Sequence, residues 1–260
     1  MISLVLPAYN PGPTADRTWF AVAGFLADRA RLGDAWEAVF VLDGCTDGTP
    51  ERLSRLAAST DARMRVESYS PNRGKGHSVR RGLLAARGSL RVFTDIDLAY
   101  SFDEVLRVAD ALRAGAQVAI ASREHPASQI LMPASVLGYA YRRHLQSRVF
   151  GVVARTLLPL TQRDTQAGLK GMTAAVAEHV VPELCCDGFG FDCELLTACA
   201  RSGIAVAETP VCVRYDDTTS TTGGKATARM LRELWQIRKA WRTRAVTLPA
   251  AEPVPLPKAA

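Results

Sequence analysis

The sequence lacks the features of a membrane-spanning or disulfide-stabilised chain. No apolar run among its 260 residues approaches the roughly 20 residues that cross a bilayer. The opening stretch "MISLVLPAYN" has no basic segment, and its apolar run is too short for a signal peptide. The six cysteines have no CxxC spacing and the four histidines are scattered, which disfavours a zinc site and predicts free thiols in a reducing compartment. We therefore expect a cytoplasmic protein, although it could still lie on the inner face of a membrane.

Aromatic residues are also scarce, at 7% of the chain, and the basic residues do not alternate with them as a base-stacking surface would require. Nucleic acid is therefore not an expected partner. The net charge of +6 instead suits a nucleotide, a phosphate or an acidic lipid, or is simply a basic surface. With 48% hydrophobic and 22% charged residues, the composition is that of a globular protein with one large domain or two small ones.

Short apolar runs alternate with helical patterns in the first half. The runs are "ISLVL" (2–6), "AVFVL" (38–42), "RVFT" (91–94) and "QVAIA" (117–121). They lack polar alternation, which is typical of strands buried on both faces. Helical patterns cover about 14–32, 49–59, 75–87 and 102–114. This order predicts an α/β fold with a mostly parallel central sheet flanked by helices, and ligands at the carboxyl ends of its strands.

The second half is richer in basic helical patterns. Residues 129–160 predict a long helix or a helix pair, and 225–244 predict a second basic amphipathic helix with Leu and Trp on its apolar face. Such helices can lie in a membrane interface, or can pack on the sheet with solvated arginines. We expect a single domain over 1–246, made of two halves, 1–125 and 126–246. The Pro/Ala-rich tail, 247–260, is expected to be disordered.

Two carboxylates, Asp95 and Asp97, stand one residue apart after the run at 91–94. In a continued strand they would point to the same face, with Ile96 opposite, and would repel each other unless a positive charge lay between them. Mg²⁺ or Mn²⁺ is held in proteins by one or two carboxylates together with substrate phosphates. The pair therefore predicts a divalent metal site that faces a diphosphate, with Asp97 as the direct ligand and Asp95 nearer the ribose or linked through water. A solvated loop is the alternative.

Three further motifs surround the same predicted edge. "DGCTDGT" offers Asp43 as an acceptor for a base or ribose, whereas Asp47 is expected to cap a helix. "NRGKGHSVRRG" places Arg73 and Lys75 beside glycines and ahead of a helix, which favours an anion. "DGFGFDCELL" places Asp192 at a helix start, where it either complements the helix dipole or acts as a catalytic base.

Together these segments resemble family 2 glycosyltransferases of the GT-A fold, and most of all dolichyl-phosphate and polyprenyl-phosphate glucosyltransferases. The matching segments run in the family's order over residues 3 to about 215: "VLPAYNPG", "VLDGCTDGT", "NRGKGHSVRRGLLAARG", "TDIDLAYSFDEVLRVADAL", "AIASRE", "DTQAGLKGM" and "GFGFDCELLTACARSGIAVAETPV".

The resemblance implies a role for each site residue. The expected nucleotide-sugar contacts are Pro7, Ala8, Tyr9, Asp43, Arg73, Lys75, Asp95, Ile96 and Asp97, with Asp97 and Asp95 holding Mg²⁺ or Mn²⁺. The expected sugar and acceptor contacts are Gln166, Gly168 and Lys170, and the catalytic residue is Asp192. The sequence departs from the family's usual motifs at Leu42, Cys45, Tyr100 and Ala167.

The implied reaction is inverting transfer of a hexose from a nucleoside diphosphate sugar, UDP-glucose in the first instance and GDP-mannose as the alternative. The implied acceptor is a polyprenyl or dolichyl phosphate; a soluble hydroxyl, peptide or natural product is the alternative. Two other classes stay open: a sugar-nucleotide pyrophosphorylase, whose Gly-rich opening loop is missing here, and a non-catalytic nucleotide-binding module.

Overall fold

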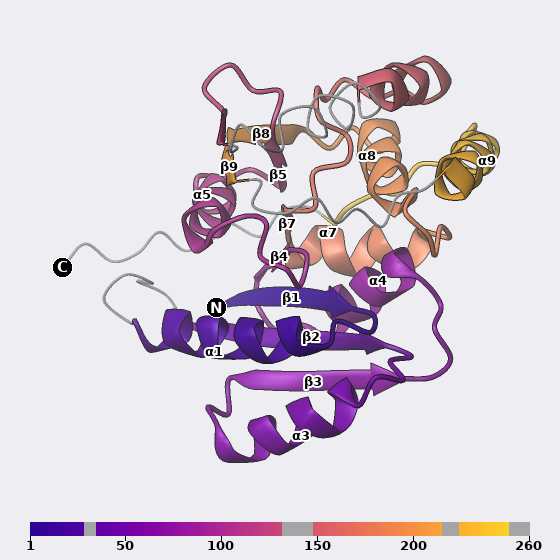
Figure 1. Ribbon diagram of the computed structural model, residues 1–260. Coiled ribbons are helices and arrows are strands. Elements are labelled where there is room, and N and C mark those ends of the chain that lie inside the picture. Colours follow the sequence, from indigo (N-terminus) through magenta and orange to yellow (C-terminus); the bar gives the residue numbers. More distant parts are fainter. Residues whose placement is uncertain (29–34, 132–147, 215–223, 250–260) are drawn as a thin grey trace.

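The computed structural model describes residues 1–28, 35–131, 148–214 and 224–249, and its core is one seven-stranded sheet (Figure 1). The strands are β1 (Ile2–Ala8), β2 (Trp36–Asp43), β3 (Met64–Tyr69), β4 (Leu90–Phe93), β5 (Val118–Ser122), β7 (Lys170–Thr173) and β8 (Val206–Pro210). Their order in the sheet is β3-β2-β1-β4-β7-β5-β8, and β7 alone among these strands runs antiparallel to its neighbours. The predicted mostly parallel α/β sheet is confirmed.

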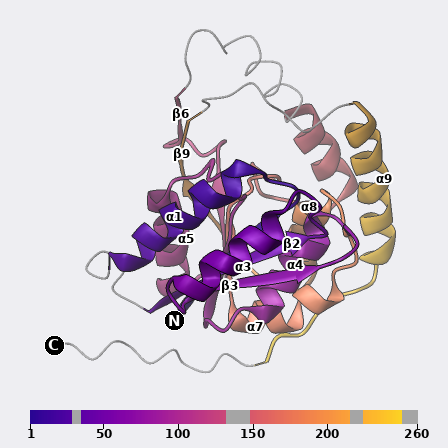
Figure 2. The same ribbon diagram turned by 60° about the horizontal axis from the view of Figure 1, so that its bottom comes forward.

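Helices cover both faces of the sheet. They are α1 (Pro13–Ala27), α3 (Thr49–Ser59), α4 (Lys75–Ala85), α5 (Phe102–Arg113), α7 (Ala174–His179), α8 (Phe191–Arg201) and α9 (Gly224–Ala240), with a 3₁₀ turn, η2 (Val181–Glu183). Residues 148–157 are also helical. Both views show this helix, in rose red, near the yellow α9 (Figures 1 and 2). No helix in the described ranges is long and apolar enough to cross a membrane.

Each central strand contributes to two cores, which explains its unbroken apolar sequence. In β1, Val5 packs in the core that α4 and α8 cover, whereas Leu4 and Leu6 pack in the core that α1 and α5 cover. In β2, Val41 packs in the core that α4 and α8 cover, and Phe40 packs in the core that α1 and α5 cover. Strand side chains alternate between faces, so a strand covered on both sides is apolar at every position.

The second half differs from its prediction. Residues 129–131 form strand β6 (Gln129–Leu131), which pairs in parallel with β9 (Cys212–Arg214), so a helix beginning at 129 is wrong. A partner strand from far along the chain decides this point. Residues 132–147 and 250–260 lie outside the described residues, and with them half of the predicted helix pair and most of the predicted tail. The predicted helix at 225–244 is α9, which ends at Ala240.

Strands β3 and β7 have no apolar run to mark them. β3 is an edge strand, "MRVESY", with mixed polar and apolar residues. β7, "KGMT", lies between β4 and β5, although 76 residues separate its first residue from Phe93, the last residue of β4. It brings Lys170 to the edge at which β4 ends, and this placement creates the candidate site.

Candidate active site

Asp95 and Asp97 lie in a turn that begins where β4 ends, at Phe93. Leu98 has a left-handed backbone (φ 51°), its N–H donates to the Asp95 carbonyl (3.1 Å), and the N–H of Ala99 donates to the Asp97 carboxylate (3.1 Å). Thr18 of α1 fixes the turn by donating to the Ile96 carbonyl over 2.6 Å. The predicted strand-like alternation of the two carboxylates is therefore wrong, because the strand stops before both of them.

The positive charge beside this carboxylate pair is Lys75. Its ammonium group lies 2.7 Å from Asp95 Oδ1. Burial tends to lower the pKa of Lys75, but the Asp95, Asp192 and Asp97 carboxylates outweigh that effect and hold it above its usual value. Burial and repulsion by Asp95 raise the pKa of Asp97. The sequence predicts Lys75, in the "NRGKG" stretch, as a nucleotide-sugar contact, and gives no sign that it pairs with Asp95.

A second lysine is paired with the predicted catalytic residue. Lys170, fully buried in β7, donates to Asp192 Oδ1 over 2.7 Å and also donates to the Ala167 carbonyl. Its ammonium lies 6.0 Å from the centre of the Phe93 ring. Asp192 is 4% exposed at the start of α8. Asp192 is therefore held in an ion pair rather than standing free as a base.

Gly168 joins these two pairs into one site. A β-carbon on Gly168 would lie 2.0 Å from Asp95 Oδ2. Glycine therefore lets the "QAGLK" segment approach the Asp95 carboxylate this closely. The structure thus brings together residues from β7, α4, α8 and the β4 turn. We call Lys75, Asp95, Asp97, Lys170 and Asp192 the carboxylate–lysine cluster.

Asp43 holds residues 72–76, "NRGKG", which we call the basic loop. Its buried carboxylate accepts hydrogen bonds from the backbone N–H groups of Arg73 (2.7 Å) and Gly74 (2.8 Å) and from the Asn72 side chain (3.0 Å). This is a role inside the protein that the sequence did not show, and the predicted contact of Asp43 with a base or ribose stays a prediction. Asp47 accepts from the N–H groups of Thr49 and Gly12, but the N-cap of α3 is Gly48, so Asp47 lies one residue before the capping position predicted for it.

The loop that leads into α8 contacts the basic loop from the other side. The Asp187 carboxylate pairs with Arg80 and lies 3.6 Å from the Arg73 guanidinium, and its carbonyl accepts from the N–H of Gly76 (2.8 Å). A β-carbon on Gly74 would lie 2.4 Å from that same carbonyl. The segments "NRGKG" and "DGFGF" are therefore packed against each other. The sequence motifs alone do not reveal this contact.

The remaining predicted contacts differ in their exposure. Pro7 and Ala8 are buried at the end of β1, whereas the Tyr9 side chain is 55% exposed just beyond it. Ile96 and Gln166 are partly buried. Tyr9 is thus the residue of the "PAYN" stretch whose ring is available to a ligand.

A buried ion pair anchors the "DTQAGLKGM" segment, and sequence reasoning did not single it out. The Asp164 carboxylate accepts from the Arg123 guanidinium (2.7 and 2.9 Å) and backbone N–H (3.0 Å). Although burial opposes the effect, these contacts hold the pKa of Asp164 below its usual value. Arg123 directly follows β5, so the only sequence signal for this ion pair was the position of the "SRE" stretch at a strand end.

Three departures from the family's motifs, Leu42, Tyr100 and Ala167, fall in the core. Leu42 is fully buried on the α1 side of the sheet, and Tyr100 is 4% exposed in the same core. Cys45 is partly buried, where it accepts from the Asn10 N–H and donates to the Ala8 carbonyl.

Helix α9 supports the start of α8. Glu233 accepts a hydrogen bond from the Gly190 N–H over 2.8 Å, and Trp241 donates to Glu194 over 3.0 Å. The other Glu194 oxygen accepts from the N–H groups of Cys185 and Cys186. The acidic residues of "DGFGFDCELL" thus have different partners, and α9 holds the loop that precedes Asp192.

The donor set fits a divalent metal only in part. Within the described ranges, no group of three or more His, Cys, Asp or Glu side chains is arranged to hold a metal ion. Asp97 and Asp95 supply two carboxylates, and Lys75 occupies one of them. Mg²⁺ is commonly bound by one or two carboxylates with substrate phosphates as the other ligands. The residues therefore fit a metal that arrives with a diphosphate.

The mostly parallel seven-stranded sheet with helices on both faces is the GT-A fold of glycosyltransferases. The model of the family described as "Glycosyl transferase family 2" matches residues 3–137, and the chain belongs to this family.

Several known proteins are similar to the chain. Glycosyltransferase AglD of Haloferax volcanii is 32% identical over 211 residues, which are 81% of this chain but 32% of that protein, so the chain spans about a third of its length. The dolichyl-phosphate beta-glucosyltransferase of Saccharomyces cerevisiae is 28% identical over 258 residues, covering 92% of this chain and 75% of that enzyme.

Among solved structures, the UDP complex of glucosyl-3-phosphoglycerate synthase from Mycobacterium tuberculosis has a TM-score of 0.57. It is 21% identical, and the match covers 92% of this chain and 80% of that one. Mannosyl-3-phosphoglycerate synthase from Rubrobacter xylanophilus has a TM-score of 0.56 at 18% identity, over 92% and 72% of the two chains. At these identities the likeness shows the fold alone.

Proposed function

We propose that the protein is an inverting hexosyltransferase that moves a sugar from a nucleoside diphosphate sugar to a polyprenyl phosphate. Dolichyl-phosphate beta-glucosyltransferases and a polyprenol monophosphomannose synthase are among its relatives, which supports this acceptor class. The donor is UDP-glucose in the first instance, by analogy with those glucosyltransferases, and GDP-mannose is the alternative.

The observation that carries the proposal is the Lys170–Asp192 ion pair at the edge of the carboxylate–lysine cluster. An acceptor hydroxyl must lose a proton to a base as it attacks, whereas a phosphate monoester is already ionised at neutral pH. Asp192, paired with a buried ammonium group, is better suited to orient its neighbours than to take a proton. A phosphate acceptor therefore suits this site better than a hydroxyl.

In the proposed step, an acceptor phosphate oxygen bonds to the anomeric carbon while the bond from that carbon to the diphosphate oxygen breaks. The electron pair of the broken bond stays on the diphosphate, and no proton moves. The Lys75 ammonium group, beside Asp95, would supply positive charge that stabilises the departing anion. Gly168 and Lys170 would approach the sugar and the acceptor phosphate.

The reaction is proposed to depend on Mg²⁺ or Mn²⁺ held by Asp97, with Asp95 as the second carboxylate. A bound metal would neutralise charge on the leaving diphosphate. Asp95 would be oriented by Lys75 and by the close approach of Gly168.

The other site residues follow the division of the chain that we propose. Residues 1–125 would bind the nucleotide sugar, through Tyr9, Arg73 and Lys75 among others, and 126–246 would bind the acceptor. Because the proposed acceptor is a membrane lipid, the protein would work in the cytoplasm at the inner face of a membrane, in peripheral contact with it.

The test is a screen of donors and acceptors with the purified chain. Thermal shift with a panel of nucleotide sugars, with and without Mn²⁺, identifies the donor, because a ligand that binds the folded state raises the melting temperature. Transfer from the radiolabelled donor to a detergent-dissolved short-chain polyprenyl phosphate then tests the acceptor. If no nucleotide sugar raises the melting temperature, the proposal fails. If transfer occurs only to water-soluble alcohols or peptides, the acceptor class is wrong.

A further inference from the structure

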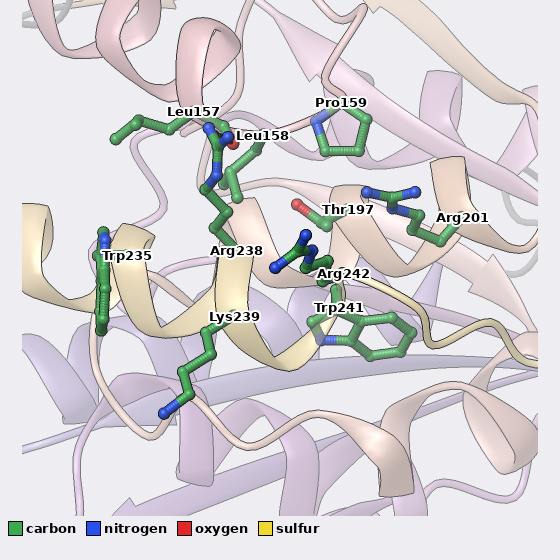
Figure 3. Close-up of a pocket in the computed structure, with 10 residues that line it drawn as sticks. All are labelled: Leu157, Leu158, Pro159, Thr197, Arg201, Trp235, Arg238, Lys239, Trp241 and Arg242. Carbon is green, nitrogen blue, oxygen red and sulfur yellow. Dashed lines mark hydrogen bonds between the residues drawn. The ribbon is translucent and has the colours of Figure 1, made fainter.

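A basic pocket lies between helix 148–157, α8 and α9, away from the carboxylate–lysine cluster. Its volume is about 600 Å³, and its lining residues are Leu157, Leu158, Pro159, Thr197, Arg201, Trp235, Arg238, Lys239, Trp241 and Arg242 (Figure 3). Asp192 and Arg201 stand at opposite ends of α8, nine residues apart. At a rise of 1.5 Å per residue, this places the pocket roughly 13 Å along the helix from Asp192.

The pocket carries uncompensated positive charge. Arg201, Arg238, Lys239 and Arg242 line it, and no carboxylate is among the lining residues. None of the four forms an ion pair with a described carboxylate; Arg238 donates to the Leu157 carbonyl over 3.2 Å, which links α9 to the neighbouring helix. Figure 3 shows the Arg201 and Arg242 side chains near Thr197, among the residues that line the pocket. Cations near helix ends complement the helix dipole, but that role does not account for the apolar residues beside them.

The two helices beside the pocket, α9 and 148–157, carry exposed apolar side chains, which we call its rim. Met230, Leu234 and Ile237 of α9, and Trp241 directly after it, are buried at helical spacing. One residue further on at each step, Leu231, Trp235, Arg238 and Arg242 form a second face, on which the Leu231 side chain is 42% exposed and that of Trp235 62%. Val149 and Val152 are also exposed on the adjacent helix. Solvation of the basic residues does not explain why a tryptophan is exposed beside them.

We infer that this pocket and its rim dock the protein on an anionic membrane surface, with lipid phosphate in the pocket and Trp235 in the interface. Arginine pairs with phosphate oxygens in a bidentate geometry, and tryptophan favours the membrane–water interface. Basic helices with such an apolar face lie in the interface plane. The inference rests on the proposed membrane contact but not on the identity of donor or acceptor.

The test is vesicle binding, with Trp235 as the reporter. Trp19, Trp36 and Trp241 are each at most 1% exposed, so Trp235 is the one exposed tryptophan of the four in the sequence. We expect anionic phosphatidylglycerol vesicles, but not phosphatidylcholine vesicles, to shift its emission to the blue. We also expect brominated lipid to quench that emission, and Trp235→Phe to abolish both signals.

The matched charge variants are Arg201→Gln/Arg238→Gln/Arg242→Gln and, as the control, Arg17→Gln/Arg55→Gln/Arg87→Gln. Both remove three exposed positive charges. Each arginine near an anionic surface contributes about fivefold to the partition coefficient, so the pocket variant should lose on the order of 100-fold and the control little. Equal losses in both variants, or none in the pocket variant, would overturn the inference.

Two further results separate this inference from its neighbours. If inorganic phosphate stabilises the folded chain but the chain does not bind vesicles, the pocket is a small-anion site and the docking role is overturned. Transfer to detergent-dissolved acceptor should be unchanged in the pocket variant, and its loss there would assign the pocket to catalysis instead. Absence of transfer in the unmodified chain would contradict the proposed function, while vesicle binding would still support the docking surface.

Discussion

The Lys170 ammonium group and the Asp192 carboxylate form an ion pair of 2.7 Å that is buried on both sides. Lys170 comes from β7 and Asp192 from the first turn of α8, so the pair joins two elements that the chain brings together only on folding. Charges buried in this way stabilise a structure only as a pair, because each alone would have lost its hydration.

Lys170→Met should destabilise the protein by about 3–5 kcal/mol, because it leaves the Asp192 charge buried with one partner fewer. Urea unfolding, followed by circular dichroism, measures the loss. The double variant Lys170→Met/Asp192→Leu should recover most of it, since an apolar pair leaves no charge unpaired. A single variant within about 1 kcal/mol of the original protein would contradict the importance of the pair.

Asp192→Asn should lower kcat for a polyprenyl phosphate acceptor by less than about 10-fold, because that acceptor needs no general base. Initial rates at saturating donor and acceptor give the value, and Glu51→Gln, on the exposed surface of α3, is the control. A loss of roughly 10²–10⁴-fold would identify Asp192 as the base of a hydroxyl-accepting enzyme.

Gly168→Ala should reduce activity far more than stability. Its β-carbon would meet Asp95 Oδ2 at 2.0 Å, and the Asp95 side chain can move away at small cost to the fold but with its carboxylate displaced. We expect a kcat/KM lower by on the order of 100-fold, as for other small misplacements of reacting groups.

The matched control is Gly24→Ala in α1, where an added β-carbon meets nothing within 4 Å. Alanine there should leave activity unchanged and stabilise the helix by about 0.5–1 kcal/mol. Equal activities of the two variants would show that Asp95 is not positioned by the "QAGLK" segment.

Asp97→Asn should weaken Mn²⁺ binding in the presence of the nucleoside diphosphate more than Asp95→Asn does, because Lys75 already pairs with Asp95. Loss of a direct ligand costs at least the roughly 10–100-fold typical of an outer partner. Electron paramagnetic resonance of free Mn²⁺ measures this binding without a turnover assay. If Asp95→Asn has the larger effect, the assignment of the direct ligand to Asp97 is wrong.

Stability should fall in acid through Asp164. The Arg123 contacts hold the pKa of Asp164 below its usual value in the folded state, so the unfolded state takes up the proton first. This contribution to the free energy of unfolding is complete above about pH 4 and is lost as the pH falls through the lower, folded-state pKa.

Asp164→Asn cannot gain or lose this proton, so its unfolding free energy should depend less on pH in that range. Urea unfolding at a series of acidic pH values compares it with the original protein and with Glu51→Gln. Parallel curves for all three would show that the Arg123–Asp164 pair adds no pH dependence.

Where strands are buried on both faces, the sequence was sufficient to predict them. β1, β2, β4 and β5 are apolar at nearly every position because helices cover both sides of the sheet, and unbroken runs are visible in a sequence. β6 defeated the prediction because its three residues are strand only through pairing with β9, more than 80 residues away.

The sequence by itself determined the mostly parallel α/β sheet, the family, and the list of polar residues at the strand ends, since all of these depend on local patterns and on the order of motifs. Only the tertiary structure decided how those residues act on one another. β7 inserts between β4 and β5 and carries Lys170 to Asp192, α4 brings Lys75 to Asp95, and Asp43 turns inward to hold the basic loop. These pairings join residues 20 or more positions apart, and their partners are set by sheet order and packing, which no local pattern encodes.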